Sequence, residues 1–165
     1  MSAGAKVIAV GERVPAGKFK IATADGLADL TTAQLFDGKR VVFFAVPGAF
    51  TPTCDARHLP GYIERADAIR AKGIDTIACM SVNDVFVMKA WGKSANAGDK
   101  VLMLADGNGD YARALGLSMD ATGFGMGQRA QRFAMVVKDG VVEQLHVEAA
   151  GKFEVSAADY VLARL

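Results

Sequence analysis

The sequence predicts an α/β fold in which a mixed central sheet is flanked by helices on both faces. Dense apolar runs at 40–46 and 74–82 are typical of strands that are buried on both sides of a sheet. Segments with helical spacing alternate with these runs, which indicates parallel strands joined by right-handed crossovers. Towards the C-terminus, Asp139-Gly140 separates two more apolar runs and predicts a hairpin, so antiparallel strands should complete the sheet.

The first half of the chain divides into strands and helices by its apolar spacing and its turn residues. The elements expected here, in order, are a strand at 18–22, a turn at Asp25-Gly26, a short helix capped by Thr31 or Thr32 that runs through Phe36, the strand at 40–46, and a helix at 59–70 closed by Gly73.

The second half continues the alternation and then ends in the hairpin and one more helix. Its expected elements are the strand at 74–82, a helix capped by Asn83 or Asp84 that carries Val87, Ala90 and Trp91, a strand at 101–105, a short helix at 111–117, hairpin strands at 132–138 and 141–147, and a final helix opened by Ser156. A thioredoxin-like fold fits this order. No linker divides the chain, so we expect a single domain over 1–165.

Composition and charge narrow the class of protein. The chain is 52% hydrophobic and 22% charged, as in an ordinary globular protein, and its formal net charge is +1. That balance argues against a nucleic-acid partner or an anionic membrane surface. No stretch is long and apolar enough to span a bilayer, and the N-terminus lacks the pattern of a secretory signal. A cytoplasmic location is therefore the expectation.

The chain has two cysteines, Cys54 and Cys79, which are too few for a disulfide scaffold or a structural zinc site. The two histidines, His58 and His146, show no ligand spacing with them. We therefore expect no metal and no cofactor. The remaining question is whether either thiol has a special neighbourhood.

Cys54 lies in the most informative stretch of the sequence, the loop 47–60 between a buried strand and a helix. Open α/β sheets place their ligand crevice at this end of their strands. A thiol in the first turn of a helix meets free backbone N–H groups and the positive end of the helix dipole, which favour the thiolate. Lowering the pKa of a thiol in this way increases the thiolate fraction at neutral pH about thirtyfold at most. Neighbouring groups that bind the substrate must therefore supply the rest of the rate enhancement.

Thr51 is placed to be one of these groups. It precedes Cys54 by one helical turn, and because its hydroxyl can both donate and accept a hydrogen bond, it can hold a substrate oxygen while bonding the thiolate. Pro47 and Pro52 have no N–H and fix the backbone around it. A Thr-x-x-Cys pair alone is explained as well by a rigid loop with an incidental buried cysteine. The two prolines, with the strand before and the helix after, favour a built site.

The string Pro47-x-x-x-Thr51-x-x-Cys54 matches the active-site signature of the peroxiredoxins. The fuller string 46–54, followed by His58-Leu-Pro-Gly61, resembles the type II, or peroxiredoxin-five, group. The resemblance continues through 78–84, 88–91 and 132–137 and covers nearly the whole chain. It implies a thioredoxin-like fold and a thiol peroxidase for antioxidant defence, which reduces hydrogen peroxide and alkyl hydroperoxides through a sulfenic acid on Cys54.

The same resemblance places the catalytic arginine of the family at Arg132, where it would stabilise the thiolate and bind the peroxide. Without the resemblance, Arg132 would be taken as a surface residue of a strand. Arg129 resembles another arginine that is common in the group. His58 follows Cys54 by four residues, but we expect a solvated or core-satisfied histidine and assign it no catalytic role.

The sulfenic acid must be resolved by another thiol. The segment 151–158 holds no cysteine, which excludes the C-terminal resolving cysteine of some type II members. Cys79 falls where plant-like members carry their proposed resolving thiol, yet it lies inside an apolar strand, where a small buried hydrophobe is the other reading. In that case the mechanism uses one cysteine, with glutaredoxin, glutathione or thioredoxin as the reductant. Both readings stay open.

The family also implies a homodimer formed through the active-site face. Phe50, Phe124 and Met126 are candidate contacts, although burial in their own core is an equal alternative. Two other functions compete with the peroxidase. A thiol–disulfide oxidoreductase predicts a second cysteine at position 57, which is Arg57. A redox-inert interaction module predicts a Cys54 of ordinary reactivity.

Overall fold

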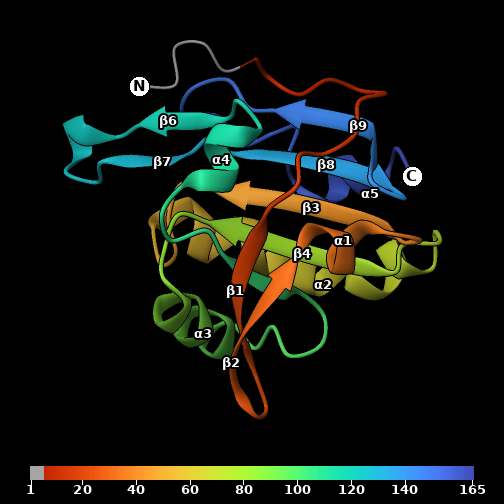
Figure 1. Cartoon of the computed structure of the whole chain (residues 1–165), viewed down its shortest axis with the longest axis horizontal. Coiled ribbons are helices and arrows are strands. Elements are labelled where there is room, and N and C mark those ends of the chain that lie inside the picture. The colour runs from red at the N-terminus through yellow and green to blue at the C-terminus, as the bar shows by residue number, and fades with distance from the viewer. Residues whose placement is uncertain (1–5) are drawn as a thin grey trace.

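The computed structural model describes residues 6–165 and centres on a seven-stranded mixed sheet (Figure 1). The strand order is β2-β1-β5-β4-β3-β8-β9, with β3, β4 and β5 parallel. The strands are β1 (Lys18–Thr23), β2 (Gly26–Thr31), β3 (Arg40–Val46), β4 (Thr76–Ser81), β5 (Leu102–Ala105), β8 (Phe133–Lys138) and β9 (Val141–Val147). A separate pair consists of β6 (Ser118–Asp120) and β7 (Gln128–Ala130).

Helices cover both faces of the sheet (Figure 1). The helices are α1 (Thr32–Phe36), α2 (Leu59–Arg70), α3 (Val85–Ser94), α4 (Asp110–Ala114) and α5 (Ala158–Leu162). α2, α3 and α5 pack on one face, and α1 and α4 pack on the other. Side chains of β3 alternate between the two cores, Phe44 on the first and Phe43 on the second, which is why the run is apolar throughout. The fold class is therefore confirmed as thioredoxin-like.

Local capping and turn chemistry also follow the sequence. Thr31 caps α1 in a capping box with Gln34, and Asp84 caps α3 by accepting from the N–H of Val87 at 2.9 Å. Asp139 and Gly140 have φ values of 47° and 79°, the left-handed conformations that a tight hairpin turn needs.

Several elements differ from expectation. The sequence did not predict β2, an exposed edge strand, or the three-residue strands β6 and β7. The helix expected at 111–117 ends at Ala114, since Gly116 adopts a φ of 73°. The final helix begins at Ala158, and Ser156 is not its cap because its hydroxyl donates to Glu148 instead. The expectations for residues 1–5, as part of the domain 1–165 and of the N-terminus without a secretory pattern, lie outside the described residues.

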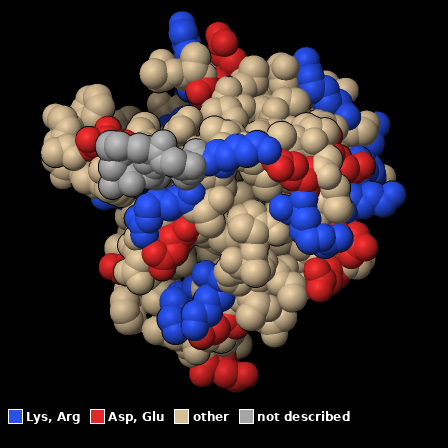
Figure 2. Space-filling model, turned by 45° about the horizontal axis from the view of Figure 1, so that its top comes forward, with Lys and Arg blue, Asp and Glu red and all other residues tan. Residues whose placement is uncertain are grey.

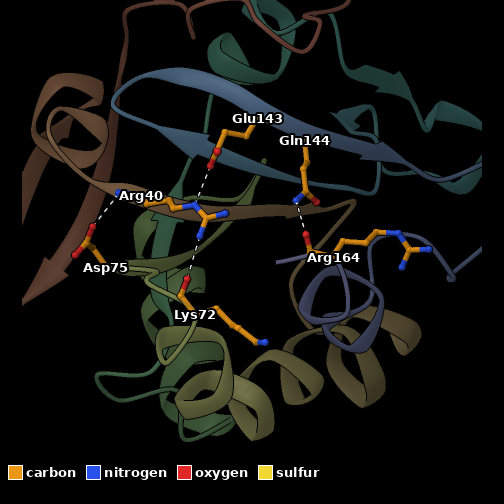
Figure 3. A network of polar contacts seen from close by, with 6 residues as sticks. All are labelled: Arg40, Lys72, Asp75, Glu143, Gln144 and Arg164. Atoms are coloured by element: carbon orange, nitrogen blue, oxygen red, sulfur yellow. Dashed lines mark hydrogen bonds and ion pairs between the residues drawn. The ribbon is translucent and has the colours of Figure 1, made fainter.

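A polar network fastens the starting end of the central strands (Figure 3). Arg40 at the start of β3 donates its backbone N–H to Asp75 at 2.9 Å, its Nε to Glu143 at 2.8 Å and its Nη1 to the Lys72 carbonyl at 3.0 Å. Gln144 of β9 donates to the carbonyl of Arg164 near the C-terminus. These contacts join β3, β4 and β9 at the edge opposite the loop that holds Cys54.

Positive and negative side chains are interspersed on the face shown in Figure 2, with no large field of one sign. This agrees with the near-neutral net charge of the sequence. Among residues 6–165, no helix has the length and apolar character needed to cross a bilayer.

Candidate active site

Cys54 lies at the point where the loop after β3 becomes a helix. Pro52 and Thr53 are already helical, and Cys54–His58 form a π-helical turn that leads into α2. In this turn the N–H of Leu59 donates to the carbonyl of Cys54. Such turns are rare, and they occur frequently at functional sites. The Cys54 side chain is completely buried.

Arg132 lies directly against the thiol. Its Nη2 donates to the Cys54 Sγ at 3.1 Å, although 78 residues separate the two in sequence. The β3–β8 pairing explains the contact. Ala45 near the end of β3 is opposite Phe133 at the start of β8, so Arg132 emerges beside the loop that follows β3. A guanidinium always carries its charge, and a charge-assisted hydrogen bond of this kind favours a thiolate over a thiol.

The second terminal nitrogen of Arg132 contacts His58. Arg132 Nη1 lies 2.8 Å from His58 Nδ1, and His58 Nε2 lies 3.1 Å from the carbonyl oxygen of Ser156. Burial, with the neighbouring Arg132 charge, lowers the pKa of His58 from 6.5 to about 3. The expectation of a core-satisfied histidine is confirmed, but its contact with Arg132 was missed. The four-residue spacing from Cys54 on a helix was the signal that could have indicated it.

Thr51 shares the loop with Cys54, but its hydroxyl is used differently from the expectation. Thr51 Oγ1 donates to the carbonyl of Gly48 at 2.7 Å, so its proton is not free to bond the thiolate at the same time. The oxygen retains acceptor capacity for the O–H of a small ligand. The Asp55 N–H donates to the Thr51 carbonyl at 2.8 Å, which ties Thr51 to the turn that carries Cys54.

The loop around Pro47 is held by two side chains from other elements. Arg129 of β7 donates from Nη1 to the carbonyls of Val82, at 3.2 Å, and Pro47, at 3.5 Å. Asn83, which follows β4, accepts from the Ala49 N–H at 2.9 Å. The role of Asn83 was missed, because its sequence position suggested only a helix cap. Together these contacts give the loop before Cys54 a fixed path.

Cys79 lies in β4, opposite Phe44 of β3, and is completely buried. It belongs to the same core as Cys54, and both thiols are free. Burial raises the pKa of the Cys79 thiol well above its usual value, and the neighbouring Cys54 raises it further. Both effects disfavour the Cys79 thiolate, which is the nucleophilic form of a cysteine. Within the described residues, no three acidic, histidine or cysteine side chains are grouped to hold a metal ion.

Comparison with known proteins supplies the family. The Redoxin family model matches residues 9–162. Peroxiredoxin-2B of Arabidopsis thaliana is 46% identical over 159 residues, which cover 96% of this chain and 98% of the relative. Chloroplastic peroxiredoxin-2E-2 of Oryza sativa is 49% identical over 163 residues, covering 96% of this chain and 72% of that protein. The crystal structure of reduced Prx3 from Vibrio vulnificus in complex with hydrogen peroxide superimposes with a TM-score of 0.92 at 53% identity, covering 96% and 99% of the two chains.

The chain belongs to the type II peroxiredoxins. It is consequently a thiol peroxidase, an oxidoreductase that reduces peroxides by cysteine chemistry. In this peroxiredoxin, the structure gathers Pro47, Thr51, Cys54 and Arg132 at one edge of the sheet. His58 joins them, and Cys79 stays in the core beneath.

Proposed function

We propose that Cys54 is the thiol of this peroxiredoxin that attacks the peroxide. The observation that carries the proposal is the 3.1 Å contact between the Arg132 guanidinium and the buried Cys54 Sγ. In the reaction, the thiolate sulfur forms a bond to the terminal oxygen of hydrogen peroxide or of an alkyl hydroperoxide. The O–O bond breaks, the leaving hydroxide or alkoxide takes up a proton, and the sulfur is oxidised to a sulfenic acid.

Arg132 and Thr51 divide the stabilisation of this step. The guanidinium charge supports the thiolate and then the oxygen that leaves, which is where negative charge develops. The Thr51 hydroxyl donates its hydrogen bond to the Gly48 carbonyl, so its oxygen accepts a hydrogen bond from the O–H of the bound peroxide and orients the peroxide. Pro47 contributes through its carbonyl contact with Arg129, which keeps the loop in place.

We propose a one-cysteine route for the reductive half of the cycle. A reductant thiol attacks the sulfenic acid, which releases water and leaves a mixed disulfide on Cys54, and a second thiol then releases reduced Cys54. The burial and raised pKa of Cys79 support this route over an internal disulfide. Glutathione with glutaredoxin, or thioredoxin, fits the reductant class. Cys79 as the resolving thiol is the alternative.

A homodimer through the active-site face is the assembly that we propose. Phe124 and Phe50 are 85% and 48% exposed, which is high for aromatic side chains beside an active-site loop. A cytoplasmic location is also proposed, on the composition of the chain alone.

One experiment tests the chemistry. Reduced protein is treated with one equivalent of hydrogen peroxide and measured by intact mass, with and without a sulfenic-acid trap. The wild type should gain one oxygen atom that the trap captures, Cys54→Ser should gain none, and Cys79→Ser should behave as the wild type. Loss of two hydrogens that Cys79→Ser abolishes would favour the internal disulfide. If Cys54 reacts with hydrogen peroxide no faster than free cysteine does, the assignment of Cys54 as the peroxidatic thiol is overturned.

A further inference from the structure

The side chain of Arg132 is held by a closed ring of hydrogen bonds that returns to its own backbone. The Arg132 carbonyl accepts from the Glu148 N–H at 3.0 Å, and the Glu148 carboxylate binds Ser156. The Ser156 carbonyl lies 3.1 Å from His58 Nε2, and His58 Nδ1 lies 2.8 Å from Arg132 Nη1. The ring leaves Nη2 of Arg132 directed at Cys54 Sγ.

This cycle of hydrogen bonds determines which nitrogen of His58 carries the proton. A guanidinium has only donors, so Nδ1 of His58 must be the acceptor at the Arg132 contact. The single N–H of the imidazole is therefore on Nε2, which donates to the Ser156 carbonyl. A doubly protonated imidazole would set N–H against N–H. Phe44 and Phe153 lie against the imidazole with ring centroids 4.9 Å away, and they exclude water from it.

Ser156 is held in turn by Glu148. One carboxylate oxygen, Oε2, accepts from the Glu154 N–H at 2.7 Å, the Ser156 N–H at 2.8 Å and the Ser156 hydroxyl at 2.6 Å. Partial burial opposes the charge, yet these hydrogen bonds outweigh it and hold the pKa of Glu148 below its usual value. The Ser156 carbonyl also accepts from the Tyr62 hydroxyl at 2.7 Å, so its position is fixed from two sides.

We propose that Glu148, which lies beyond the end of β9 and binds the segment 154–156, is a positioning residue for the peroxidase. It holds the segment 154–156, which sets the Ser156 carbonyl, which orients neutral His58, which fixes the Arg132 guanidinium against Cys54. The inference rests on the proposed roles of Cys54 and Arg132.

The test compares Glu148→Gln with Glu143→Gln, a carboxylate within β9 that pairs with Arg40 at the opposite edge of the sheet (Figure 3). The neutral amide oxygen is a weaker acceptor for three donors, so Arg132 should lose its fixed position. The rate of Cys54 oxidation by hydrogen peroxide, followed in a single turnover by the fluorescence of Trp91, should fall roughly tenfold. The thiolate fraction at neutral pH, read from its absorbance, should fall as well. Glu143→Gln should keep both at the wild-type level.

A second variant separates positioning from a general loss of structure. His58→Asn places an amide oxygen near the former Nδ1, so Arg132 keeps an acceptor while the bond to Ser156 is lost. It should be slowed as Glu148→Gln is, and the double variant should be no slower than either, because all act along one path.

The outcomes distinguish a failure of the proposed peroxidase chemistry from a failure of the Glu148 positioning role. A wild-type Cys54 that does not react with peroxide overturns the proposed function. A reactive wild type with Glu148→Gln and His58→Asn both at its rate overturns the positioning role alone, as does a double variant in which the two losses multiply. If Glu148→Gln does not fold, a wild-type oxidation rate in His58→Asn overturns the positioning role.

Discussion

At the scale of single residues, the site depends on how the two terminal nitrogens of Arg132 are used. Nη2 binds the Cys54 sulfur and Nη1 binds the His58 ring, at 3.1 Å and 2.8 Å. A lysine ammonium carries its donors on one atom and cannot hold two acceptors in this fixed fork. The charge beside Cys54 is therefore oriented by a neutral acceptor on the same helix as the thiol.

His58 should make the stability of the protein depend on pH. Its pKa is lowered from 6.5 to about 3, chiefly by burial, so between these values the unfolded chain binds a proton that the folded chain does not. Its contribution is thus complete above pH 6.5 and is lost as the pH falls towards 3. The loss should reach about 2 kcal/mol between about pH 7.5 and about pH 5.

Urea denaturation of the wild type and His58→Asn at these two pH values checks this expectation. The carboxylates that titrate at low pH are common to both proteins, so the difference between them isolates His58. The stability gap between the proteins should narrow by about 2 kcal/mol on acidification. An unchanged gap would mean that His58 accepts a proton in the fold at its ordinary pKa.

At the scale of elements, the short loop between β3 and the helix of Cys54 is packed too tightly for a larger residue at Gly48. A Cβ there would lie 3.0 Å from Thr51 Cγ2, 3.2 Å from Met126 Cε and 3.3 Å from Arg129 Nη1. Thr51 belongs to this loop, and Arg129 holds the loop through the Pro47 carbonyl. The glycine therefore allows the loop to approach β7 closely.

Gly48→Ala should consequently slow peroxide reduction and also destabilise the protein. The displaced Thr51 and Arg129 would loosen the path to Cys54, with a rate loss of several-fold and a stability loss of about 1–3 kcal/mol. Gly61→Ala is the control, because its nearest new contact in α2 is an ordinary 3.8 Å to Ala158. Single-turnover kinetics and thermal unfolding measure the two effects. A wild-type rate in Gly48→Ala would show that the loop position does not limit the reaction.

The sequence predicted the elements whose signal is local. Apolar runs and the Asp139-Gly140 turn mark β3, β4 and the β8–β9 hairpin. In contrast, β2 is an exposed edge strand, and its sequence has no dense apolar run to indicate it. The candidate site divides in the same way. Thr51 and Cys54 lie on one short motif, but Arg132 was found through family resemblance, and Glu148 and Ser156 meet His58 only through the folded chain.

At the scale of the whole molecule, the sheet order is what assembles the site. β3 lies between β4 and β8, parallel to the first and antiparallel to the second. The end of β3, the end of β4 and the start of β8 therefore share one edge, and they bring the Cys54 loop, Asn83 and Arg132 together. This edge also carries the turn 122–126, whose Met126 is bonded through its carbonyl to Arg129.

The exposed aromatic residues at this edge lead to the prediction about assembly. Phe124 is 85% exposed at the tip of the turn 122–126, and a dimer would bury it. We expect the wild type to sediment at about twice the chain mass of 17.3 kDa. Phe124→Asp should sediment as a monomer, because a charge would enter an apolar contact. Leu27→Asp, at an exposed position of β2 far along the sheet, should remain a dimer. A wild type that stays monomeric at high micromolar concentration would contradict the dimer, and a dimeric Phe124→Asp would move the interface away from the active-site edge.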